Sequence, residues 1–328
     1  MTNWQPSASQ AMLRCRAELL ASLREFFSQH GVSEVDVPVL GRSTVTDSNI
    51  ESIIAQPFGG SGYLQTSPEY FMKRLLAAGS GDIYCLGKAF RNGEAGQRHN
   101  PEFTLLEWYR CDWDEQQLMD EVADLISHIY ATTNQSTLAV HRGSYGDYFA
   151  QVLAVNPHSA PLDQLQQLAV SAGSQSWAGE TRANCLDLLF SVQVEPQLPQ
   201  GLVFVYDYPA CQSALAQTSV NDQGQLVSRR FEAFLNGMEL ANGYFELRDG
   251  AEQGQRFDED LKARSAANKP SIAVDSHLMS ALDQGLPSCA GVALGVDRLL
   301  MQLQGADSIG WLCQAPLVQL GVSHEGGD

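Results

Sequence analysis

The alternation of apolar and polar residues predicts a long amphipathic helix near the start of the chain. Its apolar stripe, which recurs at helical spacing, consists of Met12, Leu19, Leu23 and Phe26. The pattern Ser7-x-x-Gln10 is typical of a capping box and Gly31 of a helix stop, so we expect a helix from about Ala8 to His30. Residues 32–40 then alternate as a strand does, and Pro38 within them indicates an edge, a bulge or a subunit contact.

The rest of the chain is predicted to combine hairpin strands with separate helices. Strand-like segments lie at residues 82–91, 102–109, 202–206, 229–235, 238–247 and 290–296. Helix-like segments lie at about residues 69–76, 115–130, 162–172, 182–193, 251–267, 276–284 and 297–304. Asn236-Gly237 is a strong signal for a two-residue hairpin loop. Strands joined by hairpins, with helices gathered elsewhere, favour an α+β fold built on an antiparallel sheet.

The charge balance narrows the classes of partner. The chain has 328 residues, with 20 Lys and Arg against 38 Asp and Glu, which gives a formal net charge of −18. Because nucleic-acid binding by counterion release needs a basic face, we expect no stable nucleic-acid binding and no contact with anionic membranes.

The length suits about two domains of roughly 150 residues, or one large domain.

Targeting signals and common cofactor motifs do not stand out in the sequence. The strongly apolar stretches are short and residues 1–10 are polar, so we expect neither a membrane span nor a signal peptide. The seven cysteines are scattered without a C-x-x-C pair, which favours a reducing cytoplasm and no structural metal. Because the sequence has no G-x-x-x-x-G-K-[ST] pattern, any use of ATP would not rely on a P-loop.

Two carboxylates flank the predicted Asn236-Gly237 hairpin. A two-residue loop pairs Phe234 with Glu239, and Glu232 lies on the same face as Phe234. Glu232 and Glu239 would then be diagonal neighbours within about 8 Å. Since two carboxylates this close repel each other, a bound Mg²⁺ would stabilise the pair, whereas a solvated sheet face is the alternative.

The hairpin of residues 82–109 gathers a second set of side chains. Alternation places Phe103, Glu107 and Tyr109 on one face, and the intervening polar loop contributes Arg98 and His99. Such a face could form the floor of a ligand site, with the loop cations binding phosphates. The alternative is a polar surface hairpin with half-buried aromatic residues.

Two further segments have both a structural and a functional interpretation. In Gly291-Val-Ala-Leu-Gly-Val-Asp-Arg298 the glycines mark a close backbone approach, and Arg298 could stack on a base or pair with a phosphate. This segment could equally be a tightly packed strand–helix corner. In Thr66-Ser-Pro-Glu69 the carboxylate could either complement a helix dipole or bind an ammonium.

These segments, in this order, resemble the catalytic domain of class II aminoacyl-tRNA synthetases. The first helix with Gly31 and Pro38 is similar to motif one, residues 90–103 to motif two, and residues 291–298 to motif three. The runs RHNPEFT, ELANG and TSPE resemble lysyl-tRNA synthetases in particular. Because the chain leaves no room for an N-terminal anticodon-binding OB-fold, it is identified as a member of the truncated paralogues that modify elongation factor P. We expect residues 1–328 to form a single class II synthetase-like catalytic domain.

The resemblance implies roles for individual residues. The catalytic residues would be Arg91, on the α-phosphate and the amino-acid carboxylate, and Arg298, which would sandwich adenine with Phe103. The residues that would bind ATP are Arg91, Asn92, Gly93, His99, Asn100, Phe103, Glu239, Leu240, Gly295 and Arg298. The residues that would bind the amino acid are Ser67, Pro68, Glu69, Glu107, Tyr109, Asn242, Glu246 and Ala293. Of these, Tyr109 and Glu246 would receive the distal ammonium, and Glu232 and Glu239 would hold Mg²⁺.

Three features depart from the family pattern. Gly93 stands where the family usually has a glutamate that contacts adenine, so either Glu94 substitutes or one contact is missing. Ala293 replaces a glycine of lysyl-tRNA synthetases, and its methyl group would favour a β-amino acid over α-lysine. Strict alternation also puts Glu239 and Glu246 on opposite faces, so both reach one pocket only through a bulge, which we expect at Gly243.

The resemblance implies an ATP-dependent ligase with Mg²⁺ as its cofactor. Such an enzyme activates (R)-β-lysine as an acyl-adenylate and transfers the lysyl group to a lysine side chain of elongation factor P. The family implies a cytoplasmic homodimer, formed through the motif-one region. A tRNA-charging enzyme is one alternative, and a catalytically silent amino-acid-binding regulator is another.

Overall fold

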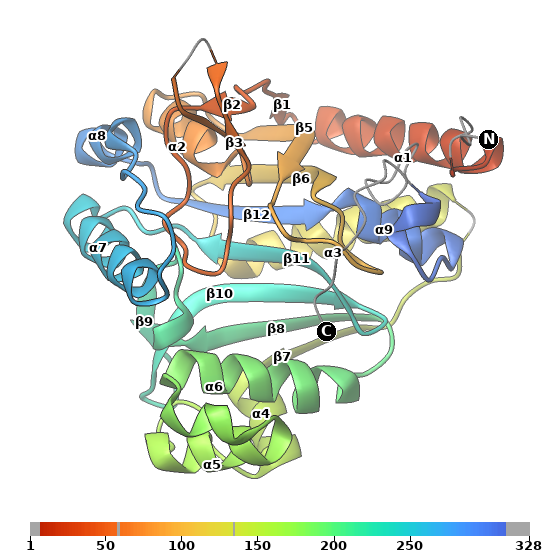
Figure 1. Cartoon of the computed structure of the whole chain (residues 1–328). Coiled ribbons are helices and arrows are strands. Elements are labelled where there is room, and N and C mark those ends of the chain that lie inside the picture. Colours follow the sequence, from red (N-terminus) through yellow and green to blue (C-terminus); the bar gives the residue numbers. More distant parts are fainter. Residues whose placement is uncertain (1–6, 58–59, 134, 313–328) are drawn as a thin grey trace, which may run out of the picture.

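A nine-stranded sheet is the central element of the computed structural model, which describes residues 7–57, 60–133 and 135–312 (Figure 1). Along the sheet the strands are β1 (Ser33–Glu34), β5 (Ile83–Phe90), β6 (Glu102–Cys111), β12 (Cys289–Gly295), β11 (Met238–Phe245), β10 (Leu226–Leu235), β8 (Leu202–Pro209) and β7 (Val140–Ser144). A short strand, β9 (Thr218–Val220), pairs with β10. A separate small sheet consists of β2 (Leu40–Gly41), β4 (Gly62–Leu64) and β3 (Ile54–Ala55).

The predicted antiparallel pairing is confirmed for all the neighbouring strands from β5 to β8. The strands at the two edges of the sheet pair in parallel instead. Strand β1 pairs with β5 in parallel, and β7 pairs with β8 in parallel. The fold is therefore α+β with a mixed sheet.

Helices flank the sheet on both faces. The α-helices are α1 (Gln10–Gln29), α2 (Glu69–Ala77), α3 (Glu115–Thr132), α4 (Tyr145–Leu153), α5 (Leu162–Ala172), α6 (Arg182–Leu189), α7 (Gly250–Ala266), α8 (Ser276–Gln284) and α9 (Val296–Gln304). The short helical turns are η2 (Gln175–Gly179), η3 (Phe190–Val194), η4 (Glu195–Gln197), η5 (Ala210–Gln212) and η6 (Ile309–Trp311). All the helices that the sequence predicted are present to within a few residues, apart from the end of the segment 182–193, where η3 replaces regular α-helix.

The N-terminal segment corrects two predictions. Helix α1 is capped by Ser9, whose hydroxyl accepts a hydrogen bond from the Met12 N–H, so the predicted cap at Ser7 is wrong. The predicted strand over residues 32–40 shrinks to β1 and the start of β2. Pro38, which lacks an N–H to donate, lies in the stretch between them that leaves the sheet.

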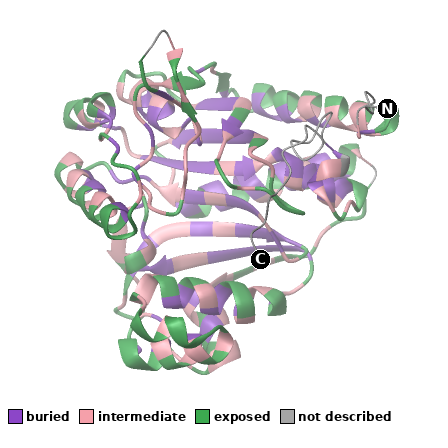
Figure 2. Ribbon diagram, viewed as in Figure 1, coloured by how far each residue is buried: buried purple, intermediate pink, exposed green. Residues whose placement is uncertain are grey.

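One face of the sheet packs against α1, α3 and α9 and carries the largest hydrophobic core. Phe27, Trp108, Ile126, Phe231 and Leu300 are fully buried there. Figure 2 shows this burial as a band of purple along the central strands. Strand residues on this face alternate with residues on the opposite face, which is the cavity face of the sheet.

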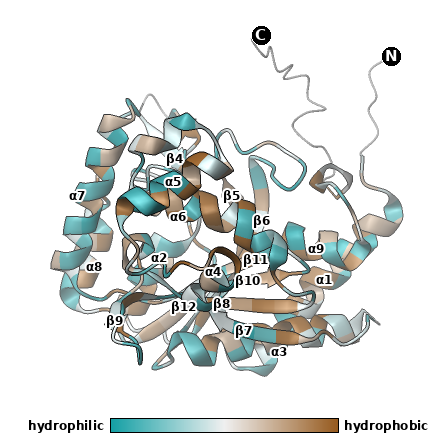
Figure 3. Ribbon diagram, turned by 90° about the horizontal axis from the view of Figure 1, so that it is seen from below, coloured by the Kyte–Doolittle hydropathy of each residue, from teal (hydrophilic) through white to brown (hydrophobic). Residues whose placement is uncertain are grey.

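Two smaller cores border the cavity face. Helices α4, α5 and α6 pack against β8 around Phe149 and Phe190, whereas α2, α7 and α8 pack against β5, β6 and β12 around Tyr70 and Phe257. In Figure 3 the outer helix α7 shows mostly hydrophilic colours, which matches its position at the surface. The two groups of helices lie on either side of the central strands (Figure 1).

A β-bulge in the β10–β11 hairpin sets which residues face the cavity. Phe234 pairs with Glu239 and Ala233 with Ala241, so Leu240 is the extra residue. The predicted bulge at Gly243 is wrong, because Gly243 pairs regularly with Phe231. A methyl group at Gly243 would lie 2.5 Å from the Phe231 ring, which explains the glycine by close packing in the core.

Neither membrane helices nor disulfides appear in the described segments. Their helices are all too short or too polar to cross a bilayer. The six cysteines in these segments are free thiols, and Cys313 lies outside them.

Candidate active site

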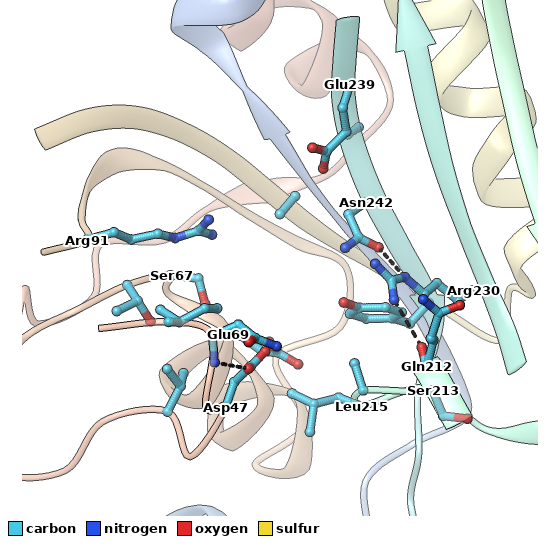
Figure 4. Close-up of a pocket in the computed structure, with 18 of the residues that line it drawn as sticks. Asp47, Ser67, Glu69, Arg91, Gln212, Ser213, Leu215, Arg230, Glu239 and Asn242 are labelled. Atoms are coloured by element: carbon cyan, nitrogen blue, oxygen red, sulfur yellow. Dashed lines mark hydrogen bonds between the residues drawn. The ribbon is translucent and has the colours of Figure 1, made fainter. Parts of the chain in front are cut away.

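A cavity of about 1090 Å³ opens on the cavity face of the sheet. Strands β6, β11 and β12 form its floor, and its walls come from α2, α6, α7 and the loop of residues 91–100. Figure 4 shows the Arg91 guanidinium entering from one side, with Glu239 and Asn242 on the floor and Glu69 on the wall. The cavity has two ends of different chemistry.

Arg91 and Phe103 form one part of the first end. The Arg91 guanidinium lies over the Phe103 ring, 5.2 Å from its centroid, and is 3.6 Å from the Glu94 carboxylate. Its buried Nε has no hydrogen-bond partner among the described residues. An unpaired guanidinium nitrogen beside an aromatic face is suited to an anionic, planar ligand.

Arg298 forms the opposite side of this end. Its guanidinium donates hydrogen bonds of 2.8 and 3.1 Å to the Glu239 backbone carbonyl and carboxylate, and it lies 2.7 Å from Nε2 of His99. Burial, together with the neighbouring Arg298, lowers the pKa of His99, so the imidazole is neutral at pH 7 and can accept that hydrogen bond. Three predicted ATP residues from separate segments are thus bonded together.

The two predicted metal ligands lie in different environments. Glu239 lines the cavity, with its side chain 41% exposed. Glu232 does not line it, and its carboxylate accepts hydrogen bonds from Arg230 and from the Tyr208 hydroxyl. Burial raises the pKa of Glu232 to about 7, although Arg230 opposes the rise. No three His, Cys, Asp or Glu side chains converge as a metal site in the described residues, so phosphate oxygens would have to complete the coordination of a cation.

Glu107 and Tyr109 form the floor of the second end. The Tyr109 hydroxyl donates a 2.8 Å hydrogen bond to Oε1 of Glu107, while Oε2 is buried and no described residue forms a hydrogen bond with it. Burial and the nearby Glu69 and Glu246 raise the pKa of Glu107 well above its usual value. An unpaired buried carboxylate oxygen that lines a cavity is suited to an ammonium ligand.

Because Gly291 has no side chain, it leaves room for the Tyr109 and Glu246 side chains on this floor. A methyl group there would lie 2.3 Å from the Tyr109 ring and 2.6 Å from Oε1 of Glu246. Only glycine therefore fits between these two side chains.

Lys73, which lies behind the second end, is a residue that sequence reasoning missed. This lysine on α2 is 2% exposed and lies 2.7 Å from the Glu69 carboxylate and 2.6 Å from the Glu246 carboxylate. The i,i+4 spacing of Glu69 and Lys73 was a signal that could have revealed the first contact. The second contact depends on tertiary packing and had no signal in the sequence.

Most of the predicted site residues line this one cavity. They are Ser67, Glu69, Arg91, His99, Asn100, Phe103, Glu107, Tyr109, Glu239, Leu240, Asn242, Glu246, Ala293, Gly295 and Arg298. The predicted residues that do not line it are Pro68, Asn92, Gly93 and Glu232.

The loop around Gly93 shows why glycine occupies that position. Gly93 has φ of +80°, a left-handed conformation that other residues rarely adopt. Glu94, its neighbour, lines the cavity and faces Arg91. Of these two residues, Glu94 is therefore the one whose side chain can reach a ligand in the cavity.

Ala293 occupies the middle of the floor. It pairs in register with Glu107 on one side and with Asn242 on the other. The Asn242 side chain is bonded in turn to Arg230 (Figure 4). The Ala293 methyl group therefore lies on the cavity floor beside Glu107 and Asn242.

Comparison with known proteins agrees with this geometry. Residues 2–318 match the family model described as tRNA synthetases class II (D, K and N). A protein of Photorhabdus laumondii named elongation factor P--(R)-beta-lysine ligase is 47% identical over 317 residues, covering 94% of this chain and 95% of the relative. A protein of Edwardsiella ictaluri with the same name is 46% identical over 319 residues, covering 94% and 96%. The chain thus belongs to the class II tRNA synthetase family, together with the relatives named elongation factor P--(R)-beta-lysine ligase.

Proposed function

We propose that this chain is an ATP-dependent ligase that activates (R)-β-lysine as an acyl-adenylate and transfers it to a lysine side chain of elongation factor P. The observation that carries the proposal is one cavity with a cationic, aromatic end and a carboxylate-rich end. The first suits a nucleotide and the second suits an amino acid with ammonium groups. The names of the relatives supply the identity of the amino acid and of the acceptor protein.

Arg91 is the residue best placed to assist adenylation. In this step the amino-acid carboxylate attacks the α-phosphate of ATP, a P–O bond forms and pyrophosphate leaves. Negative charge concentrates on the phosphoryl oxygens in the transition state, and the Arg91 side chain points into the cavity (Figure 4). Arg298 would hold the adenine against Phe103, which requires the Arg91 guanidinium to leave that ring when ATP binds.

Mg²⁺ fits the donor set of the nucleotide end in part. Glu239 presents its carboxylate to the cavity, and Glu232 is the second carboxylate on the same hairpin. Oxygen ligands of this kind suit Mg²⁺, which when bound would neutralise phosphate charge. The protein's own role in this region is to orient Glu239 through its two hydrogen bonds from Arg298.

The second step joins the activated lysyl group to the acceptor. A neutral lysine amine attacks the carbonyl carbon of the adenylate, an amide forms, AMP leaves and the amine loses a proton. The net charge of −18 would suit an acceptor surface that is basic around its target lysine.

The proposal also covers the domain organisation of the chain, its homodimeric state and its location in the cell. One continuous sheet spans all three hydrophobic cores, which supports a single catalytic domain. The small sheet near the motif-one segment carries exposed Leu40 and Ile54, the latter 59% exposed, which supports a homodimer interface there. The free cysteines suit the cytoplasm.

ATP–pyrophosphate exchange tests the proposal. Exchange would be measured with (R)-β-lysine, α-lysine and the other common amino acids, without tRNA or acceptor protein. We expect the highest exchange with (R)-β-lysine. Exchange led by α-lysine would favour the tRNA-charging alternative, and no exchange with any amino acid would favour a silent regulator.

A further inference from the structure

We propose that Lys73 is a positioning residue for amino-acid binding, whose buried ammonium holds Glu69 and Glu246 in the arrangement that receives a substrate with two ammonium groups. The inference rests on the proposed function and deepens it. It assigns a role to a buried cation that does not itself line the cavity.

Lys73 lies directly behind the carboxylate wall. Its side chain is 2% exposed, and its ammonium bridges Glu69 on α2 with Glu246, which follows β11. Glu246 is 1% exposed and its Oε1 lies against Gly291, on the cavity floor. Through Lys73 the helix that bears Glu69 is therefore tied to the strand end that bears Glu246.

The charges at this end of the cavity match a doubly charged ligand. Three carboxyl groups, those of Glu69, Glu107 and Glu246, surround one lysine, and when a dicationic ligand favours their ionised forms the formal charge of the four groups is −2. An amino acid with two ammonium groups balances this charge, and its carboxylate extends towards Arg91. Without Lys73 the site would hold three mutually repelling carboxylates, and burial would force at least one to bind a proton.

The other groups around this cluster do not replace Lys73. The groups that interact with its members are the hydroxyls of Tyr70, Tyr109 and Tyr244 and the thiols of Cys85 and Cys289. Asp260 interacts in turn with Tyr70, and Arg248 with Cys289. Within the described residues, no other cation forms an ion pair with Glu69 or Glu246. Burial raises the pKa of Glu246, and Lys73 opposes that rise.

The test compares Lys73→Met and Lys73→Arg with a matched control. Arg110→Met removes another buried cation that bridges two carboxylates, Asp82 at 2.9 Å and Glu121 at 3.3 Å, away from the cavity. Titration calorimetry would give the Kd for (R)-β-lysine between pH 6 and 9, and the Kd for ATP as a check of folding. Pyrophosphate exchange would separate KM from kcat.

We expect Lys73→Met to raise the Kd for (R)-β-lysine by 30-fold or more, with the ATP Kd changed by less than threefold. Its amino-acid binding should strengthen as pH rises towards 9, because a larger fraction of Glu246 is then ionised without the help of Lys73. Lys73→Arg should retain the wild-type pH dependence, and Arg110→Met should lose stability without a specific loss of amino-acid binding.

Three results would overturn the proposal. One is an amino-acid Kd for Lys73→Met within threefold of wild type with the same pH dependence. Another is a loss of amino-acid binding in Arg110→Met as large as in Lys73→Met. The third is failure of both Lys73 variants to bind ATP, which would assign Lys73 to folding alone. If the wild-type protein itself binds no diamino acid, the proposed function fails instead, and this inference fails with it.

Discussion

Substitution of Gly291 by alanine should damage the amino-acid end of the cavity more than the nucleotide end. The new methyl carbon would lie 2.3 and 2.5 Å from two Tyr109 ring carbons and 2.6 Å from Oε1 of Glu246. Ordinary carbon–carbon contacts are about 3.5–4.0 Å, so at least one of the three groups must shift by about 1 Å. Tyr109 is fully buried and Gly291 lies in a paired strand, so neither can move freely.

The size of the effect follows from this overlap. Overpacking of this kind costs about 1–3 kcal/mol of folding free energy. Displacement of Tyr109 and Glu246 should also weaken amino-acid binding by about tenfold or more, since 1.4 kcal/mol corresponds to a factor of ten. The KM for ATP should change little, because the nucleotide end is built by other residues.

Two glycine controls make the measurement specific. At Gly243 a methyl group would lie 2.5 Å from the Phe231 ring on the core face, so Gly243→Ala should lose stability without a selective loss of amino-acid binding. A methyl group at Gly87 would meet, among the described residues, only the Cys85 sulfur at 3.7 Å, so Gly87→Ala should be close to neutral. Urea unfolding and exchange kinetics would be measured on all three. An amino-acid KM for Gly291→Ala equal to that of Gly243→Ala would refute the reasoning.

Three further predictions concern single side chains. Arg91→Ala should lower kcat for pyrophosphate exchange by about 10²–10³, as expected for the loss of a charge-stabilising donor, and an unchanged kcat would remove Arg91 from the chemistry. The pKa of Glu107 is raised well above its usual value by burial and neighbouring carboxylates, so its stabilising contribution is present at low pH and is lost as pH rises above about 4.3. Glu107→Gln should therefore stabilise the ligand-free protein more at pH 8 than at pH 5 in thermal unfolding, while it abolishes amino-acid activation; equal effects at both pH values would contradict this. Ala293→Gly should increase exchange with α-lysine relative to (R)-β-lysine, and no gain for α-lysine would show that the methyl group does not set the preference.

The elements of this fold could be predicted largely from local pattern. The local sequence pattern located α3, α7 and α8 within a few residues, and Asn236-Gly237 located the β10–β11 hairpin with its first two cross-strand pairs. The failures were at places where the backbone departs from regular geometry. Alternation required a bulge somewhere between Glu239 and Glu246, but only the full packing of β11 between β10 and β12 places it at Leu240.

The site could be predicted as a set of residues but not as a network. The motifs identified most of the side chains that line the cavity, because those residue types recur at fixed spacings. The sequence did not indicate that Arg230 holds Glu232 or that Lys73 bridges Glu69 to Glu246. These ion pairs join residues that are brought together by strand register and by packing of α2 on the sheet.

The most direct test of the account is the mass of elongation factor P after incubation with this protein, ATP, Mg²⁺ and (R)-β-lysine. We expect the mass to increase by one lysyl group on a single lysine side chain, with no increase when ATP is omitted or when Arg91→Ala replaces the wild-type protein. An unmodified acceptor, together with lysine attached to tRNA in a parallel reaction, would contradict the account.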